Sequence, residues 1–402
     1  MRTTLFKPAL ISIAVSTAIW AVPGTAQEKK AEKASDVEVI QVSGIRGSLI
    51  RAQAEKMENT SIVEAISAED IGKLPDSSIA ESLSRLPGLA GERVGGRTSG
   101  ISVRGFKEDF TGTSLNGREL IGIGDNRGVE YDLYPSEIMT GATIYKTTDA
   151  SLMVQGIGGT VDLRTARPLQ AKETLTLNGV YEVNQRDSDN PEYDNKGKRF
   201  SLSFVEKFAN DTIGLAVAAA TTDSPNNQRK YGVWGYSKND AGQLLPTGLD
   251  TQSISTKLER DTVSAVLQYQ PNEKLDVVLD VLDINYADSG VLRGFIEPFS
   301  SANVTGSGVN SKGTQINANP VLRTDPLQKD GDLSAYGLNV KYQLNDKWEA
   351  VVDIARSESS KRDLRGESYA GLARSGALNS SQFGSREFEM SADGIFFTKL
   401  TG

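Results

Sequence analysis

The sequence contains no cysteine and no histidine among its 402 residues. Disulfides, zinc fingers and thiol or imidazole catalysis are therefore excluded, because the side chains that they need are absent. The formal net charge of −8 leaves no basic surplus to neutralise phosphates, which excludes nucleic acid as a partner. Carboxylates alone could bind a metal, but no spacing marks such a site, and no cofactor is predicted.

The N-terminus has the pattern of a secretory signal. Arg2 and Lys7 form a basic start, Ala9 to Val22 is mostly apolar, and Gly24-Thr25-Ala26 supplies the small residues of a cleavage site. The apolar run is short for a membrane anchor, and no later run reaches the about 20 apolar residues of a spanning helix. We therefore predict a signal peptide over residues 1–26 and export of the mature chain.

Residues 27–47 are predicted to form a mobile periplasmic tether. The stretch up to Ser35 is charged and Ala-rich, with too little apolar material to fold. The following Asp36–Gly44 is a short β-prone run with no obvious sheet partner in the neighbouring sequence. Such a strand is available for pairing with a strand of another protein.

Residues 48–168 are predicted to form a compact α/β unit. Asn116-Gly117 supplies the positive φ angles of a type I′ turn and so predicts a tight hairpin over Ser114–Leu120. The glycines at 156–159 precede a strand and not a helix, so they favour a tight turn over a phosphate-binding loop. The other predicted helices are Ser48–Met57, one that the capping box Ser67–Asp70 opens, and one capped by Asp76 or Ser77 that stops at Pro87-Gly88. The other predicted strands are Ser61–Ile66, Ile101–Gly105, Thr143–Tyr145 and Thr160–Thr165.

From Glu173 the sequence changes to alternating apolar and polar residues. About seven strands are predicted, each near the about ten residues that cross a bilayer at a tilt. Short turns are predicted at Asn210-Asp211, Pro271-Asn272 and Asn345-Asp346, and long polar loops at Gln185–Lys198, Asp223–Arg260 and Ala287–Asp332. Because short and long connections alternate strictly, the pattern is typical of an outer-membrane barrel, with a soluble β-domain as the alternative.

Several segments, in this order and spacing, resemble the TonB-dependent outer-membrane receptors, within the large subgroup that has sugar-uptake members. The matching segments are Glu38–Gly44, Ser67–Asp76, Ser82–Gly88, Ile101–Gly105, Leu115–Gly117, Ile144–Lys146 and Gly156–Pro168. The resemblance covers the signal, the whole plug and, by pattern only, the strands that follow.

The resemblance implies an α/β plug domain, residues 48–168, followed by the antiparallel transmembrane strands of a β-barrel of about 22 strands. Residues 169–402 supply only about seven of these, so we expect an incomplete barrel in a fragment or a truncated reading frame. The implied location is the outer membrane of a Gram-negative bacterium, in contact with its lipid. The implied partners are a nutrient ligand and TonB, the periplasmic energy transducer, which would pair with the TonB-box-like residues Glu38, Val39, Ile40, Gln41, Val42, Ser43 and Gly44.

Three plug segments, 91–100, 107–112 and 122–130, are predicted to be the apex loops that face the ligand. Their candidate ligand-facing residues are Arg93, Arg97, Lys107, Asp109, Phe110, Asp125 and Arg127. The long segment 223–260 adds the loop aromatics Tyr231, Trp234 and Tyr236, which could stack on sugar rings or on the aromatic groups of a siderophore, or could be packing anchors.

A second set of residues is predicted to hold the plug together: Arg104, Gly105, Asn116, Gly117, Arg118, Gly158 and Gly159. Arg104 and Arg118 each fall in a short predicted strand, where a buried arginine needs carboxylate partners. Glu119, Glu130 and Glu137 are the candidates, and an exposed position remains the alternative for Arg118.

The favoured function is energised import of a scarce nutrient. No nucleophile–base pattern is visible; Asp280 and Asp283 are explained as polar residues facing a wet lumen, so the chain is not predicted to be an enzyme. An oligosaccharide is the expected cargo by subgroup resemblance, with a ferric siderophore as the alternative. A passive porin-like channel or an adhesin remains a further alternative, although neither needs a plug.

Overall fold

The computed structural model describes residues 45–67, 79–94, 96–238, 242, 244–298, 302–305, 312–318, 320–371, 384–391 and 394–401. They belong to the second of two compact units of the chain, Ser43–Gly402. The predicted signal peptide and the TonB-box-like residues lie outside the described residues. In the described part of the chain, no helix is long and apolar enough to cross a membrane.

The plug is built on a five-stranded sheet in the order β1-β6-β7-β4-β5, with a separate β2-β3 hairpin. Only β4 and β7 run parallel in the five-stranded sheet. The first helix in the described part of the chain, α2, begins at Ile45, inside the range predicted as the tether. The elements are α2 Ile45–Glu58, β1 Val63–Ser67, α3 Ile79–Leu83, β2 Leu89–Val94, β3 Arg97–Val103, η1 Glu108–Phe110, β4 Thr111–Leu115, β5 Arg118–Glu119, η2 Tyr131–Leu133, η3 Ser136–Ile138, β6 Gly141–Tyr145 and β7 Gly159–Arg164.

Apolar side chains from several of these elements meet in the plug interior. Ile101, Tyr134, Ile144 and Leu163 are fully buried, which accounts for the compactness of the unit. The predicted turn at Asn116-Gly117 is confirmed, with φ angles of 54° and 81° between β4 and β5.

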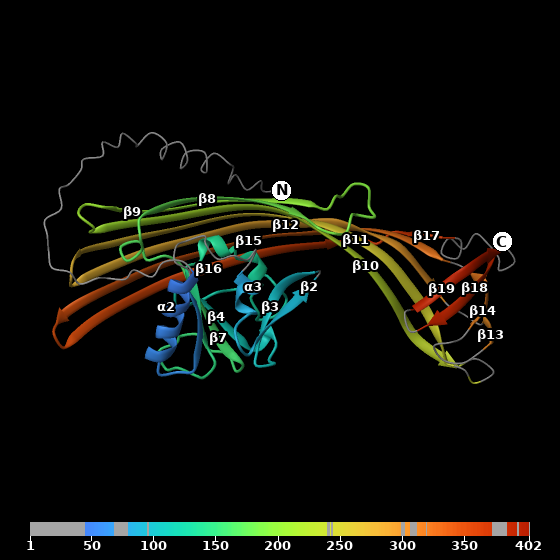
Figure 1. Ribbon diagram of the computed structural model, residues 1–402, viewed down its shortest axis with the longest axis horizontal. Helices are drawn as coiled ribbons and strands as arrows, with labels where there is room; N and C mark the ends of the chain where they lie inside the picture. Colours follow the sequence, from blue (N-terminus) through green and yellow to red (C-terminus); the bar gives the residue numbers. More distant parts are fainter. Residues whose placement is uncertain are drawn as a thin grey trace. The chain divides into compact units, whose positions relative to one another are not determined.

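Seven long antiparallel strands follow in the order β16-β15-β12-β11-β10-β9-β8 and run side by side in Figure 1. Three short turns close the hairpins β9-β10, β11-β12 and β15-β16, close to the predicted positions. The strands are β8 Thr174–Val183, β9 Lys196–Phe208, β10 Ile213–Lys238, β11 Leu244–Asn272, β12 Leu275–Pro298, β15 Val321–Asn345 and β16 Trp348–Arg365, with β17 Tyr369–Ala370 paired to β15.

Two predictions about these strands are wrong. The strands β10 and β11 have 26 and 29 residues and not about ten, and the predicted loop 223–260 is a paired extension of both, from Asp223↔Glu259 to Lys238↔Leu244. Similarly, β12 and β15 extend into the predicted loop 287–332. Cross-strand pairing satisfies the backbone of these polar segments, so they need no apolar alternation to form strands.

Alternate residues of the long strands divide between two faces. On β11, Arg260, Thr262 and Gln268 are buried, and Arg260 donates a hydrogen bond to the backbone oxygen of Asp132 in the plug. We call this the inner face. The intervening Leu267 and Tyr269 are exposed on the opposite, outer face.

The outer face carries an exposed apolar band. The register places on it Leu175, Leu177, Phe200, Leu267, Tyr269, Leu279, Tyr336, Tyr342, Leu344, Trp348, Val352 and Ile354, all exposed. Apolar residues facing out and polar residues facing in is the alternation of a membrane β-barrel wall. Asp280 lies on the inner face as predicted, whereas Asp283 has the opposite parity and lies on the outer face, against the prediction.

A smaller sheet packs near the far end of β10–β12. It has the order β13-β14-β18-β19, formed by Ala302–Thr305, Lys312–Ala318, Gly384–Ser391 and Gly394–Thr401. Phe388 and Ile395 from this sheet are buried with Leu249 of β11. The buried carboxylate of Glu297, in β12, pairs with Arg386 at 2.6 Å, which ties the small sheet to the long strands.

Candidate functional site

Arg118 joins the plug to the inner face of the long strands. Arg118 is the first residue of β5 and directly follows the Asn116-Gly117 turn. Its guanidinium is bonded to Asp280 of β12 at 2.6 Å and to Asp353 of β16 at 2.6 Å. A side chain at Gly337 on β15 would collide with the guanidinium, so glycine there makes room for it. Planar, forked donors suit arginine for a bridge between two carboxylates.

The predicted partners of the two plug arginines are wrong. Arg118 is buried, but it pairs with neither Glu119, Glu130 nor Glu137. Glu137 instead pairs with Arg199 of β9 at 2.9 Å, and Glu130 accepts a hydrogen bond from the backbone of Ile123. The glutamates lie close to Arg118 in sequence, whereas its true partners lie in strands that only the fold brings near.

Arg104 is not in a strand and is not buried. It is exposed in the turn after β3 with a φ of 52°, followed by Gly105 with a φ of 84°. Its backbone N–H donates to the carbonyl oxygen of Gly88 at 2.7 Å. In this structure Arg104 therefore contributes through its backbone, which forms the turn and the hydrogen bond to Gly88. Side chains at Gly158 and Gly159 would collide with Phe106 and Val103, respectively.

Polar bridges also connect the apex side of the plug to the long strands. Arg97, at the start of β3, pairs with Asp288 of β12 at 2.9 Å, and Asp125 pairs with Lys361 of β16 at 2.5 Å. Both were predicted to face the ligand. In this structure both side chains form ion pairs that connect the plug to the inner face. These ion pairs are partly exposed to solvent, so each contributes little to stability.

The three predicted apex loops lie together. Asn126 donates to the carboxylate of Glu108 at 3.0 Å, and the backbone N–H of Arg127 donates to Asp109 at 2.9 Å. Phe110 meets Phe106 edge to face, with centroids 6.1 Å apart. Of the predicted ligand-facing residues, six are exposed: Arg93, Lys107, Asp109, Phe110, Asp125 and Arg127.

The sequence pattern gave no sign of a carboxyl pair between these loops. The side chains of Glu92 and Glu108 both lie against Gly100, and their proximity raises the pKa of Glu92 and lowers that of Glu108. Burial raises the pKa of Glu130 in the neighbouring loop. The apex therefore combines exposed cations with carboxyl groups of differing proton affinity, and it is not a uniformly positive surface.

The three predicted loop aromatics lie on strand β10 and do not act as one group. Tyr231 and Trp234 differ by three residues and so lie on opposite faces. The Tyr231 hydroxyl accepts a hydrogen bond from the backbone N–H of Ile395 at 2.9 Å, as a packing anchor would. Trp234 has the parity of the inner face, and Tyr236 follows it after Gly235, whose φ is 60°.

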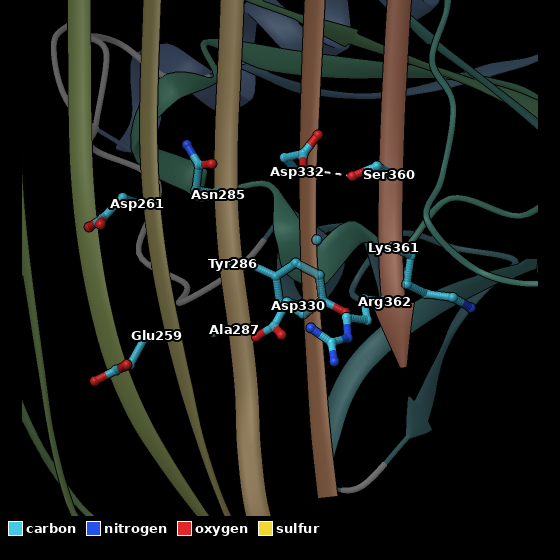
Figure 2. Close-up of a pocket in the computed structure, with 11 residues that line it drawn as sticks. Glu259, Asp261, Asn285, Tyr286, Ala287, Asp330, Asp332, Ser360, Lys361 and Arg362 are labelled. Atoms are coloured by element: carbon cyan, nitrogen blue, oxygen red, sulfur yellow. Dashed lines mark hydrogen bonds between the residues drawn. The ribbon is translucent and has the colours of Figure 1, made fainter. Parts of the chain in front are cut away.

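A hollow in the described part of the chain lies away from these residues. It has a volume of about 460 Å³ and lies between β11, β12, β15 and β16 (Figure 2). Glu259, Asp261, Asp330 and Asp332 line it from outer-face positions, with Ser360 donating to Asp332 at 2.7 Å. None of the predicted ligand-facing residues lines this hollow. Among the described residues, no group of acidic side chains is arranged to hold a metal ion.

Comparisons with known proteins agree with the plug. Residues 55–160 match the family profile of the TonB-dependent Receptor Plug Domain. No curated protein sequence matches the chain. An α/β plug domain followed by antiparallel strands with an apolar outer face defines a plugged outer-membrane barrel. Residues 55–160 thus have the plug of a TonB-dependent receptor, and the antiparallel strands that follow are typical of the barrel wall around such a plug.

Solved structures of low similarity include the ferric citrate transporter FecA in its unliganded form, 12% identical with a TM-score of 0.37 over 85% of this chain and 62% of that one. The alcaligin outer-membrane receptor FauA from Bordetella pertussis is 14% identical, with a TM-score of 0.33 over 82% of this chain and 60% of that one. The copper transporter OprC is 12% identical, with a TM-score of 0.41 over 85% and 49%. The chain thus spans about half to three fifths of the length of these proteins.

Proposed function

We propose that the protein imports a scarce nutrient across the outer membrane, with TonB as the periplasmic partner that pairs with residues 38–44. The observation that carries this proposal is the plug itself, attached through Arg118 to Asp280 and Asp353 on the inner face. A plug that is bonded to the barrel wall blocks passive diffusion of a ligand, so the plug must be moved before the ligand can pass. A porin-like channel or an adhesin gains nothing from such an obstruction.

The N-terminal end of the plug supports the same mechanism. Helix α2 follows the TonB-box-like residues directly in the chain, and it is joined to the plug sheet by the Glu55–Arg164 pair at 2.7 Å and the Lys56–Glu64 pair at 2.7 Å. Tension applied to residues 38–44 therefore reaches α2 before it reaches the sheet. The protein transports its ligand and does not transform it.

An oligosaccharide is the cargo that we propose. The inner-face indole of Trp234 offers an apolar plane for a sugar ring, and the apex mixes acids with bases. A ferric chelate is the second candidate, favoured by the exposed cations Arg93, Lys107 and Arg127, which suit an anionic ligand.

The substitution Ile40→Pro tests the import mechanism. Strand pairing depends on backbone N–H groups, and proline removes one, whereas Ile40→Ala keeps it. Cells that produce each variant are given radiolabelled maltopentaose, cellopentaose, chitopentaose or ferric citrate, and surface binding and uptake are measured separately. We expect Ile40→Pro to bind the accepted ligand normally and to lose uptake, and Ile40→Ala to retain most of it. Uptake by Ile40→Pro at the wild-type rate would show that the segment is not a TonB box.

A further inference from the structure

We propose that Trp234 is the stacking platform for a neutral sugar ring and that Gly248 sets its orientation, an inference that rests on the import function above. Trp234 on β10 pairs with Gly248 on β11. A β-carbon at Gly248 would collide with the six-membered ring of the indole, so the ring lies over the glycine backbone. Trp234 nonetheless remains 41% exposed, which leaves indole surface accessible to a ligand.

The backbone around the indole is fixed. The hydroxyl of Thr247 donates to the carbonyl oxygen of Trp234 at 2.7 Å. Gly235 has a φ of 60°, a conformation that other residues seldom adopt, and a side chain there would collide with Thr247. A rigid aromatic plane loses little conformational entropy on binding, so these contacts favour its use as a recognition surface.

The polar neighbours of Trp234 favour a neutral ligand. Lys230 shares the inner-face parity and pairs with Asp250 of β11 at 3.6 Å. Their opposite charges leave no surplus for an anionic chelate, while both groups can bond to hydroxyls. A pyranose presents C–H groups to an aromatic face and hydroxyls around its rim, which matches an indole beside an ammonium and a carboxylate.

The same face leads to the plug apex. Asn226 on β10 has the parity of Trp234, and its side chain lies against Gly96, at the tip of the β2-β3 hairpin. The exposed Arg93 belongs to that hairpin. Trp234 therefore lies further along the face that the plug tip touches. Tyr231 lies on the opposite face with its hydroxyl bonded to Ile395, and it is excluded from this platform.

The tryptophan content makes the test direct. Residues 1–402 contain three tryptophans, and Trp20 lies in the predicted signal peptide, so Trp348→Phe leaves Trp234 as the single indole of residues 27–402. Trp348 is 68% exposed beside the short β15-β16 turn, far along the chain from Trp234. The full mature chain carrying Trp348→Phe, in detergent micelles, is titrated with maltopentaose, cellopentaose, chitopentaose and ferric citrate, and its fluorescence is recorded.

We expect one of the pentaoses to shift the Trp234 emission saturably. In the matched protein carrying Trp234→Phe, emission from Trp348 should not respond, and binding measured by calorimetry should weaken about tenfold, the scale of one lost stacking contact. Gly248→Ala should weaken binding similarly because it tilts the indole, while near-ultraviolet circular dichroism checks that each variant is folded.

Three results would overturn the inference: no pentaose binds, a pentaose binds without altering Trp234 emission, or Trp234→Phe and Gly248→Ala bind as tightly as the parent. A saturable response to ferric citrate alone would overturn the sugar class. Failure of the import function is distinguishable, because it appears as undiminished uptake in Ile40→Pro while the fluorescence response of Trp234 persists.

Discussion

The central sheet of the plug and its first helix are held in place by different forces. In the sheet, Ile144, Val161 and Leu163 are completely buried. In α2, Ile50 is 48% exposed and Met57 is 81% exposed, so these apolar side chains contribute little to attachment. Burial of apolar area is the main stabilising term in proteins, whereas partly exposed ion pairs contribute little each.

The described contacts between helix α2 and the sheet include several polar ones. The carboxylate of Glu55 accepts hydrogen bonds from Arg164 and Thr143, and Glu64 of β1 pairs with Lys56 of α2 and with Lys146 at 3.0 Å. We therefore expect that α2 can separate from the sheet while Ile144, Val161 and Leu163 stay buried. The predictions below test this division, beginning with the largest expected effect.

Leu163→Ala should destabilise the plug by about 4 kcal/mol, because a fully buried leucine leaves a cavity in a packed core. The measurement is urea unfolding of the detergent-solubilised protein. Ile50→Ala in α2 is the matched control and should change the unfolding free energy by less than about 0.5 kcal/mol. Equal changes in the unfolding free energy for the two substitutions would contradict the claim that apolar burial stabilises the sheet more than it stabilises α2.

Arg118→Leu should cost about 3 kcal/mol, since it leaves Asp280 and Asp353 facing each other without a cation; Asp353 is partly exposed, which limits the loss. Arg118→Lys should recover only part of it, because an ammonium cannot bridge two carboxylates as a fork does. Limited proteolysis of the plug reports the attachment. Unchanged cleavage rates in Arg118→Leu would mean that other contacts hold the plug.

Acid should loosen α2 more than it loosens the sheet. Burial alone would raise the pKa of Glu64, but hydrogen bonds from Lys56 and Lys146 outweigh it and lower the pKa below the ordinary 4.5. A carboxylate with a lowered pKa stabilises the fold above its ordinary pKa, and this contribution is lost as the pH falls through the folded value.

Hydrogen-exchange protection of α2, corrected for intrinsic rates, should therefore be constant from about pH 6 to 8 and fall below about pH 4.5. Glu64→Gln should weaken protection at neutral pH and flatten its dependence on pH. The comparison fails if β7 loses protection at the same pH as α2.

Local patterns predicted most elements of the plug and the succession of long strands along the chain, but not the β2-β3 hairpin, most of which was predicted as the loop 91–100. The Asn116-Gly117 turn and the alternation along Leu275–Val281 are visible within a few residues, so the sequence alone indicates them. The extension of β10 was missed because its residues beyond Asp223 are mostly polar, and their strand conformation comes from pairing with β11. Only the folded chain shows such pairing.

The candidate site depends more heavily on distant contacts. Arg118 is separated from Asp280 by 162 positions and from Asp353 by 235, so its partners could not be read from spacing. Tyr231 and Trp234 were predicted as aromatics of one loop, whereas strand β10 places them on opposite faces. The TonB-box-like residues and the identity of the ligand stay predictions.

The proposed import mechanism places tension on α2 first, and we therefore expect α2 to leave the plug sheet during import. Because the chain has no cysteine, Glu55→Cys and Arg164→Cys can be joined selectively by a short bis-methanethiosulfonate linker that reductant cleaves. The account predicts that the linked protein binds its ligand normally, fails to import it, and regains import on reduction, while each single-cysteine variant imports throughout. Import by the linked protein at the rate of the reduced one would contradict it.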